Sequence, residues 1–263
     1  MNVEETLAEL VGIESVSMGS NAEIIAYLSA RCEALGLGVR RLSYTDERGV
    51  EKLNMIALAG AASSSPSATE ALTEVELALV GHTDTVPFDP AWATALRLTE
   101  RDGRLYGRGA CDTKGFIAAA LAAVEATGMA SLKRPLALVF TADEEIGCLG
   151  AKHLADAGVL RARYSIVGEP TGLQPMRAGK GYCLAEIIVR GREGHSAYPA
   201  LGASAIFRAA RLVKRIEELA GELKADVSEA FEPPHTTLNV GLIEGGTAKN
   251  IIAGECRFTL EWR

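Results

Sequence analysis

The segments Thr113–Thr127, TKGFIAAALAAVEAT, and Leu136–Thr141, LALVFT, together decide the fold. The first is rich in Ala and is followed by Gly128, a composition typical of a helix that stops at a glycine. The second is a short apolar run, typical of a buried strand. Similar runs occur at Leu53–Ala59, Val75–Val80 and Tyr164–Val167. Strands that are apolar on both faces and alternate with helices predict an α/β fold, a mainly parallel sheet sandwiched by helices.

Two further segments of this first region predict local structure, one a helix and the other a loop. Apolar residues recur at helical spacing, just before Gly36, at Ile24, Leu28, Cys32 and Leu35. This spacing predicts a helix that ends at the glycine. The low-complexity stretch Ala61–Thr69, AASSSPSAT, is interpreted as a surface loop between two strands.

The pattern changes near Gly179, where we expect a domain boundary. The elements predicted beyond it are a strand at Tyr182–Arg190, a helix at Ala203–Leu219, and strands at Thr237–Ile243 and Glu255–Trp262. Residues 1–179 and 180–263 are therefore predicted to form two domains, the second a smaller α+β unit. A split βαβ, or ferredoxin-like, fold would continue with a second helix and a fourth strand. The chain instead reaches Arg263 within a strand, and we expect it to be incomplete.

Composition limits the classes of partner. The chain has 27 Lys and Arg against 34 Asp and Glu, a net charge of −7, which disfavours binding to nucleic acid. No apolar run reaches the ~18 residues of a membrane span. The five cysteines are scattered without a CxxC motif, and the N-terminus has no signal-peptide pattern. We therefore expect a cytoplasmic protein that binds neither nucleic acid nor a membrane.

Acidic and histidine residues follow the predicted strands or, in one case, directly precede the predicted helix at Thr113–Thr127. They are His82, Asp84, Asp112, Asp143, Glu144, Glu145 and Glu169. A single His after a strand is more often structural, and an acidic run is more often a solvated surface. In an open α/β sheet, however, residues after parallel strands meet at one edge. Carboxylates gathered there repel one another unless cations neutralise them, and imidazole mixed with carboxylates suits zinc, cobalt or manganese.

Five motifs extend this pattern, in order along the chain. They are GHTDTVP (81–87), GRGACDTKG (107–115), TADEEIG (141–147), VGEPT (167–171) and GREGHSAYP (191–199). Together they resemble the metallopeptidase family that includes aminoacylase, carboxypeptidase G and succinyl-diaminopimelate desuccinylase. Three stretches are most similar to the branch that deacetylates N2-acetylornithine: HTDTVPFD (82–89), GEPTGLQPMRAGKG (168–181) and GGTAKNII (245–252).

The resemblance implies a catalytic first domain with two divalent metal ions, zinc foremost and cobalt or manganese as alternatives. His82, Asp112 and Glu169 would hold one ion, and Asp112 and Glu145 the other. It also implies a cis peptide bond between Asp112 and Thr113. Two ions bridged by an Asp would make a two-metal hydrolytic centre.

The resemblance also assigns roles around the metals. Glu144 would be the general base, and Asp84 would hydrogen-bond the far nitrogen of His82. Spacing supports the second role, because residues two apart in an extended segment share one side. His195 in the second domain would stabilise the oxyanion in the site of a partner subunit, which implies a homodimer through that lid domain. Asn250 and Arg263 would contact substrate.

These roles imply removal of the acetyl group from N2-acetylornithine, a step of arginine biosynthesis. A related desuccinylase or dipeptidase is the alternative within the family, and a truncated chain that binds metal without turnover is the alternative outside it. Family members continue past Arg263, where a second terminal His ligand would lie. We therefore expect this chain alone to bind one metal ion tightly and to turn over little or no substrate.

Overall fold

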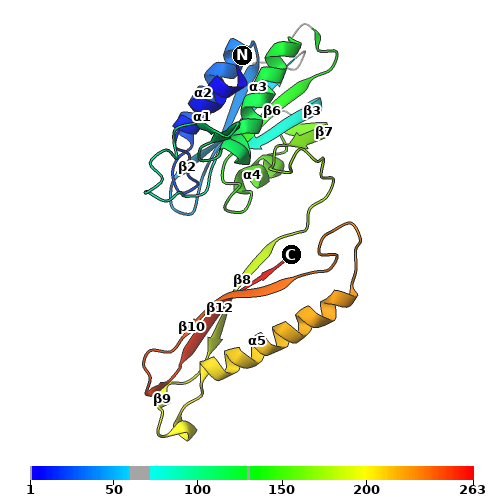
Figure 1. Ribbon diagram of the computed structural model, residues 1–263. Coiled ribbons are helices and arrows are strands. Elements are labelled where there is room, and N and C mark those ends of the chain that lie inside the picture. The colour runs from blue at the N-terminus through cyan, green and yellow to red at the C-terminus, as the bar shows by residue number, and fades with distance from the viewer. Residues whose placement is uncertain (1, 60–71, 129–130) are drawn as a thin grey trace. The chain divides into compact units, whose positions relative to one another are not determined.

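The structure is a computed structural model that describes residues 2–59, 72–128 and 131–263. It divides into two compact units, Met1–Leu173 and Gln174–Arg263 (Figure 1). The sequence places the boundary at 179/180, and the contacts of the structure place it between Leu173 and Gln174. The predicted loop Ala61–Thr69 lies outside the described residues.

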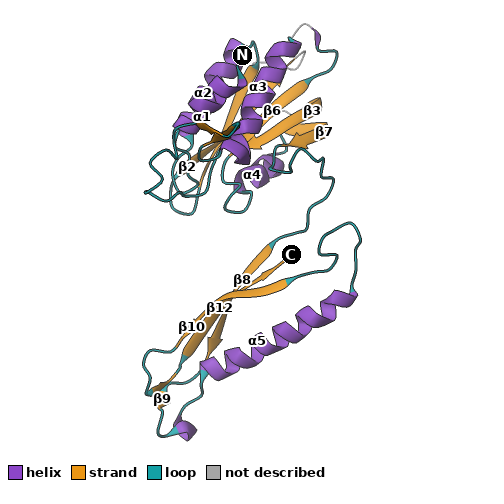
Figure 2. Ribbon diagram, viewed as in Figure 1, coloured by secondary structure: helices purple, strands orange, loops and turns teal. Residues whose placement is uncertain are grey.

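Unit 1 is built on a five-stranded sheet of order β1-β2-β6-β3-β7 (Figure 2). The strands are β1 (Gly38–Thr45), β2 (Glu51–Ala59), β3 (Thr73–His82), β6 (Leu136–Thr141) and β7 (Leu160–Val167). Strand β3 pairs in parallel with β6 and β7, whereas β2 is antiparallel to both β1 and β6. Four of these strands therefore point one way, and β2 points the other. This confirms the α/β class and its mainly parallel sheet.

Helices cover both faces of this sheet. On one face α1 (Val3–Gly12), α2 (Ala22–Ala34) and α3 (Gly115–Thr127) pack in one cluster with β2 and β6. On the other face, Leu154 of α4 (Leu149–Ala157) packs against a second cluster that includes Ile56 and Val139. The predicted helix before Gly36 is confirmed as α2, whose Ile24, Leu28 and Cys32 are fully buried.

Strand β7 is less buried than its composition predicts. Its Tyr164, Ile166 and Val167 side chains are 57%, 53% and 58% exposed, so the expectation of a buried strand at Tyr164–Val167 is wrong. The reason is position, because β7 forms the edge of the sheet and pairs with β3 alone. A short hairpin of β4 (Thr99–Arg101) and β5 (Arg104–Tyr106) stands apart from this sheet.

Unit 2 is an α+β unit with a three-stranded antiparallel sheet of order β10-β12-β8. Its elements are β8 (Cys183–Arg190), β9 (Gly194–His195), η4 (Pro199–Leu201), α5 (Ala205–Glu222), η5 (Leu223–Ala225), β10 (Leu238–Gly245), β11 (Ile251–Ile252) and β12 (Glu255–Trp262). Helix α5 covers one face of the sheet (Figure 1) and buries Ala205 and Ala209 against Cys256 and Phe258. Within the described part of the chain, no helix has the length and apolarity needed to cross a bilayer.

Candidate metal centre

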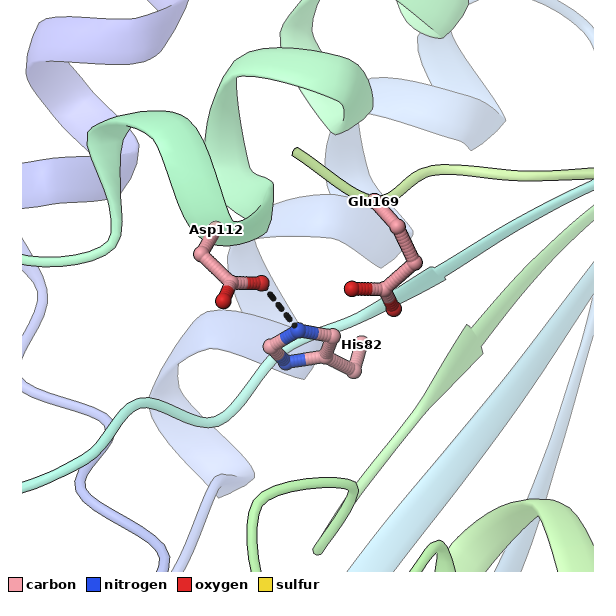
Figure 3. A group of neighbouring side chains, drawn as sticks. All are labelled: His82, Asp112 and Glu169. Atoms are coloured by element: carbon pink, nitrogen blue, oxygen red, sulfur yellow. Dashed lines mark hydrogen bonds and ion pairs between the residues drawn. The ribbon is translucent and has the colours of Figure 1, made fainter. Parts of the chain in front are cut away.

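Three of the predicted ligands meet where the parallel strands end. His82 is the last residue of β3, and Glu169 follows the end of β7 by two residues. Asp112 lies in the turn η2 (Ala110–Lys114) that precedes α3. One ligand atom from each residue lies within 4.8 Å of the others (Figure 3). The sequence motifs thus identified side chains that converge from three separate segments.

The backbone around Asp112 departs from regular helix. Asp112 and Thr113 have non-helical angles, with φ of −119° and −132°. The Asp112–Thr113 peptide bond is cis, as the sequence resemblance implied. The Thr113 hydroxyl donates to the carbonyl of Gly168 at 2.7 Å, which ties this turn to the residue before Glu169. Two of the ligand segments are therefore joined directly.

Glu144 and Glu145 lie in the turn between β6 and α4. Their backbone N–H groups donate to the two carboxylate oxygens of Asp84, at 3.0 Å to Oδ1 and 3.1 Å to Oδ2. Both side chains are half-buried. Glu145 and Asp112 line the same cavity of about 170 Å³. The turn thus places one of its two glutamates beside the residue predicted to bridge the metals.

The two ring nitrogens of His82 have different partners. Nε2 lies 2.9 Å from Oδ1 of Asp112. Nδ1 lies 2.9 Å from the backbone carbonyl oxygen of Asp84 and 3.5 Å from its Oδ1. Asp84 therefore does face the far nitrogen, but its carbonyl oxygen is closer than its carboxylate. A fixed acceptor at Nδ1 leaves Nε2 as the nitrogen that faces the cluster.

The electrostatic field of the cluster favours a cation. Burial alone would lower the pKa of His82, but hydrogen bonds with Asp84 and Asp112 outweigh it and raise the pKa to about 10. Burial and then the charge of Asp112 raise the pKa of Glu145 above its ordinary value. Burial also raises the pKa of Glu169, with the negative charge of Asp112 adding to it against the opposing effect of His82. These carboxylates are destabilised by burial and, to a smaller extent, by one another, as expected where a divalent ion would supply the missing positive charge.

The donor set fits such an ion. One imidazole nitrogen and carboxylate oxygens, within a few ångströms, are ligands that suit zinc, cobalt and manganese. His82 is 2% exposed, whereas Asp112 and Glu169 remain accessible. The cluster thus has a buried side and an open side, unlike a closed structural site.

The other predicted residues belong to unit 2. His195 in β9 pairs with Ile251 of β11, and the carbonyl of Asn250 accepts a hydrogen bond from Ser196, so His195 and Asn250 lie side by side. Arg263 lies at the opposite end of the sheet, past the last residue of β12 (Figure 1). Its guanidinium donates to Glu261 at 2.7 Å. Unit 2 therefore separates Arg263 from the His195–Asn250 pair.

Two contacts of the site were missed by sequence reasoning. The Ser17 hydroxyl donates to Oδ2 of Asp84 at 2.7 Å, from a segment that carried no motif. The thiol of Cys148 donates to Oε1 of Glu144 at 3.4 Å. Burial and then this hydrogen bond raise the pKa of Cys148 to about 11. The position of Cys148 four residues after Glu144, in a turn entering a helix, was the one signal available.

Comparison with known proteins agrees with this arrangement. The chain is 57% identical, over 259 residues, to the acetylornithine deacetylase of Myxococcus xanthus, covering 98% of this chain and 66% of that protein. A solved tripeptidase from Staphylococcus aureus is 25% identical with a TM-score of 0.70, covering 99% of this chain and 65% of that one. A metallo-carboxypeptidase from Sulfolobus solfataricus has the same fold, with 21% identity and a TM-score of 0.63, covering 100% of this chain and 71% of that one.

The chain thus spans just under two thirds of the length of the first two relatives. The model of the peptidase family M20/M25/M40 matches residues 78–248, a range that includes each of the three clustered residues. The chain belongs to peptidase family M20/M25/M40.

Proposed function

We propose that this chain is the metal-binding part of a cytoplasmic amide hydrolase of arginine biosynthesis, which converts N2-acetylornithine to ornithine and acetate. The observation that carries the proposal is the convergence of His82, Asp112 and Glu169 within 4.8 Å. The 57% identity to an acetylornithine deacetylase supports the choice of substrate. Conversion of an acetylated amino acid fits a site that combines a cation position with a nearby proton acceptor.

The proposed site holds two divalent ions, with zinc as the first choice and cobalt or manganese as alternatives. His82, Asp112 and Glu169 would hold one ion, and Asp112 and Glu145 the other. Bound there, the ions would polarise the amide carbonyl and lower the pKa of a water molecule. The half-exposed carboxylate of Asp112, which faces both His82 and the cavity of Glu145, supports its place between the two ions.

Glu144 is the proposed proton carrier. It would take a proton from the attacking water and deliver it to the leaving amine. Adjacent residues of a turn cannot project the same way, so Glu145 can ligate while Glu144 stays free. The backbone of Glu144 is held by Asp84, and its Oε1 accepts a hydrogen bond from Cys148.

Unit 2 is the proposed lid and dimerisation domain. His195 would donate a hydrogen bond to the developing oxyanion in a partner subunit's site, and Asn250, beside it, would contact the same substrate. Arg263 would bind a substrate carboxylate through its guanidinium. Because Arg263 already pairs with Glu261, that role requires exchange of one carboxylate partner for another.

The decisive experiment compares substrates on purified protein with zinc or cobalt added. N2-acetylornithine should be hydrolysed faster than N-succinyl-diaminopimelate or a dipeptide, both by this chain extended through its whole reading frame and, more weakly, by the chain as given. Glu144→Gln should lower kcat by about 10²–10⁴-fold while zinc binding persists. Glu217→Gln, an exposed position on α5, is the matched control and should change nothing. Preference for the succinyl substrate or the dipeptide would replace the proposed reaction, and metal binding without turnover of any substrate by the extended chain would reject it.

A further inference from the structure

Lys52 is a fully buried lysine that the proposed reaction does not use. Its side chain is 1% exposed. Its ammonium lies 2.7 Å from the carbonyl oxygen of Ser17, 2.7 Å from that of Gly19, and 2.8 Å from Oδ1 of Asp143. An ammonium has three N–H donors, and here each one has an acceptor. All three N–H donors are therefore satisfied, and the carboxylate of Asp46 lies 4.0 Å away. Two of the three acceptors, Ser17 and Asp143, belong to segments that contact or precede the glutamate turn.

The contact with Asp143 fixes the start of the turn that carries the two glutamates. Asp143 is 0% exposed and has a φ of +54°, a left-handed conformation that a non-glycine residue rarely adopts. Its second oxygen accepts the hydroxyl of Tyr44 at 2.9 Å. Glu144 and Glu145 are the next residues, so the direction in which they leave the sheet depends on how Asp143 is held.

The contact with Ser17 reaches the same turn from the other side. The carbonyl of Ser17 accepts from Lys52, and its hydroxyl donates to Asp84 at 2.7 Å. The carboxylate of Asp84 in turn accepts the N–H groups of Glu144 and Glu145. Lys52 therefore connects to the glutamate turn by two independent routes, through Asp143 and through Ser17 and Asp84.

We infer that Lys52 is a positioning residue for the proposed general base Glu144 and the proposed ligand Glu145, and this role rests on the proposed function. A buried ammonium is costly to desolvate, and a residue that filled this space for stability alone would be better apolar. Its hydrogen bonds instead hold two distant segments in fixed positions: that of Asp143, 91 positions away in the chain, and that of Ser17, 35 positions away. A small displacement of a reacting group lowers the rate of reaction by a large factor. Fixing the turn that carries Glu144 would therefore keep the rate of the proposed reaction high.

The test measures amide hydrogen exchange in the peptide that spans the glutamate turn, with kinetics alongside. Lys52→Met removes the ammonium and keeps the length of the side chain. Because this leaves Asp143 as an unpaired buried charge, the charge-neutral pair Lys52→Met with Asp143→Asn is made as well. Two controls accompany them. Lys152→Met changes an exposed lysine of the adjacent helix α4, and Leu28→Ala destabilises the core of unit 1 away from the site.

In both Lys52 variants the amides of Glu144 and Glu145 should exchange about tenfold faster or more, while those of β6 keep the wild-type rate. Where the wild type turns over substrate, kcat should fall about tenfold or more with KM held within about twofold. Neither control should show this local pattern. Wild-type exchange in the turn of the double variant, or acceleration spread equally over β6, would overturn the inference. An extended chain that hydrolyses no acylated amino acid would reject the proposed function instead, and the exchange result would still decide the role of Lys52 in fixing the turn.

Discussion

The carboxylate of Asp84 accepts the backbone N–H of Glu144 at 3.0 Å, and the same carboxylate accepts that of Glu145 at 3.1 Å. Asp84, which lies two positions after His82 at the end of β3, therefore also holds the turn that follows β6. Position of the imidazole and position of the glutamates are consequently coupled. A change at Asp84 should affect both.

Asp84→Asn tests this coupling. Burial alone would raise the pKa of Asp84, but His82, Ser17 and the Glu144 N–H lower it below its ordinary value, so the carboxylate is ionised near neutral pH. In the amide one of these two oxygens is replaced by an NH2 group, which donates and cannot accept the N–H that the oxygen held. The free energy of unfolding should fall by about 1–3 kcal/mol, measured by chemical denaturation. Asp156→Asn, in an exposed pair with Lys152, should leave stability unchanged, and an equal loss in both variants would contradict the coupling.

Zinc titration by calorimetry tests the cluster itself. Within the described residues, one imidazole, that of His82, meets Asp112 and Glu169, so this chain should show one tight zinc site. His82→Ala should weaken that site by about 10²-fold or more, since second-sphere changes alone cost up to that factor. His235→Ala is the control, because its carbonyl rather than its ring holds Lys180. Two tight sites in the wild type, or equal loss in the control, would show that the ligands are misassigned.

Gly168→Ala should disturb the site through packing. A Cβ at Gly168 would lie 2.1 Å from Cγ of the Phe116 ring, so the ring or the backbone before Glu169 must move. We expect a loss of stability of about 1–3 kcal/mol and weaker zinc binding, measured by thermal unfolding and calorimetry. At Gly179 a Cβ meets no atom within 4 Å, so Gly179→Ala should change neither quantity. Unaltered zinc affinity in Gly168→Ala would mean that Glu169 does not depend on this contact.

Thiol labelling tests the burial of the cysteines. Cys111, Cys148 and Cys183 are exposed, and Cys32 and Cys256 are buried. Burial raises the pKa of Cys32 to about 12, so little reactive thiolate exists at pH 8 and labelling should require unfolding. The pKa of Cys148, also raised, should make it react more slowly than Cys183. Mass spectrometry after timed alkylation gives the order, and labelling of Cys32 in the native protein at the rate of Cys183 would contradict it.

Much of the fold could be predicted because its signals are local. Spacing of apolar residues located α2, the Ala-rich composition located α3, and short apolar runs located β2, β3 and β6. Alternation of polar and apolar residues located β8. Strand β1 was not predicted, because Arg40 and Arg41 interrupt its apolar character at a half-exposed position. The burial of β7 was mispredicted for a non-local reason, since which strand becomes an edge is decided by the order of the sheet.

The candidate site was predictable as a set of residues and not as a set of contacts. The motifs indicated that His82, Asp112 and Glu169 gather, because strand ends meet at one edge. They could not indicate that the closest acceptor for Nδ1 of His82 is a backbone oxygen. Nor could they indicate Lys52, since lysine is a residue type that is almost never fully buried without a partner, and its partner Asp143 is 91 positions away.

The reversed direction of β2 has a practical consequence for redesign of this scaffold. Because β2 runs against its neighbours, its first residues lie where the other strands end, and Lys52 and Asn54 face the turn from Ala142 to Gly150. A directed-evolution library that treats every position of β2 as part of the hydrophobic core would randomise Lys52 and Asn54 together with the apolar residues that pack in that core. Both residues should therefore be held constant, together with Asp84, Glu144, Glu145 and Glu169, while the other positions of the loops after β3, β6 and β7 are varied.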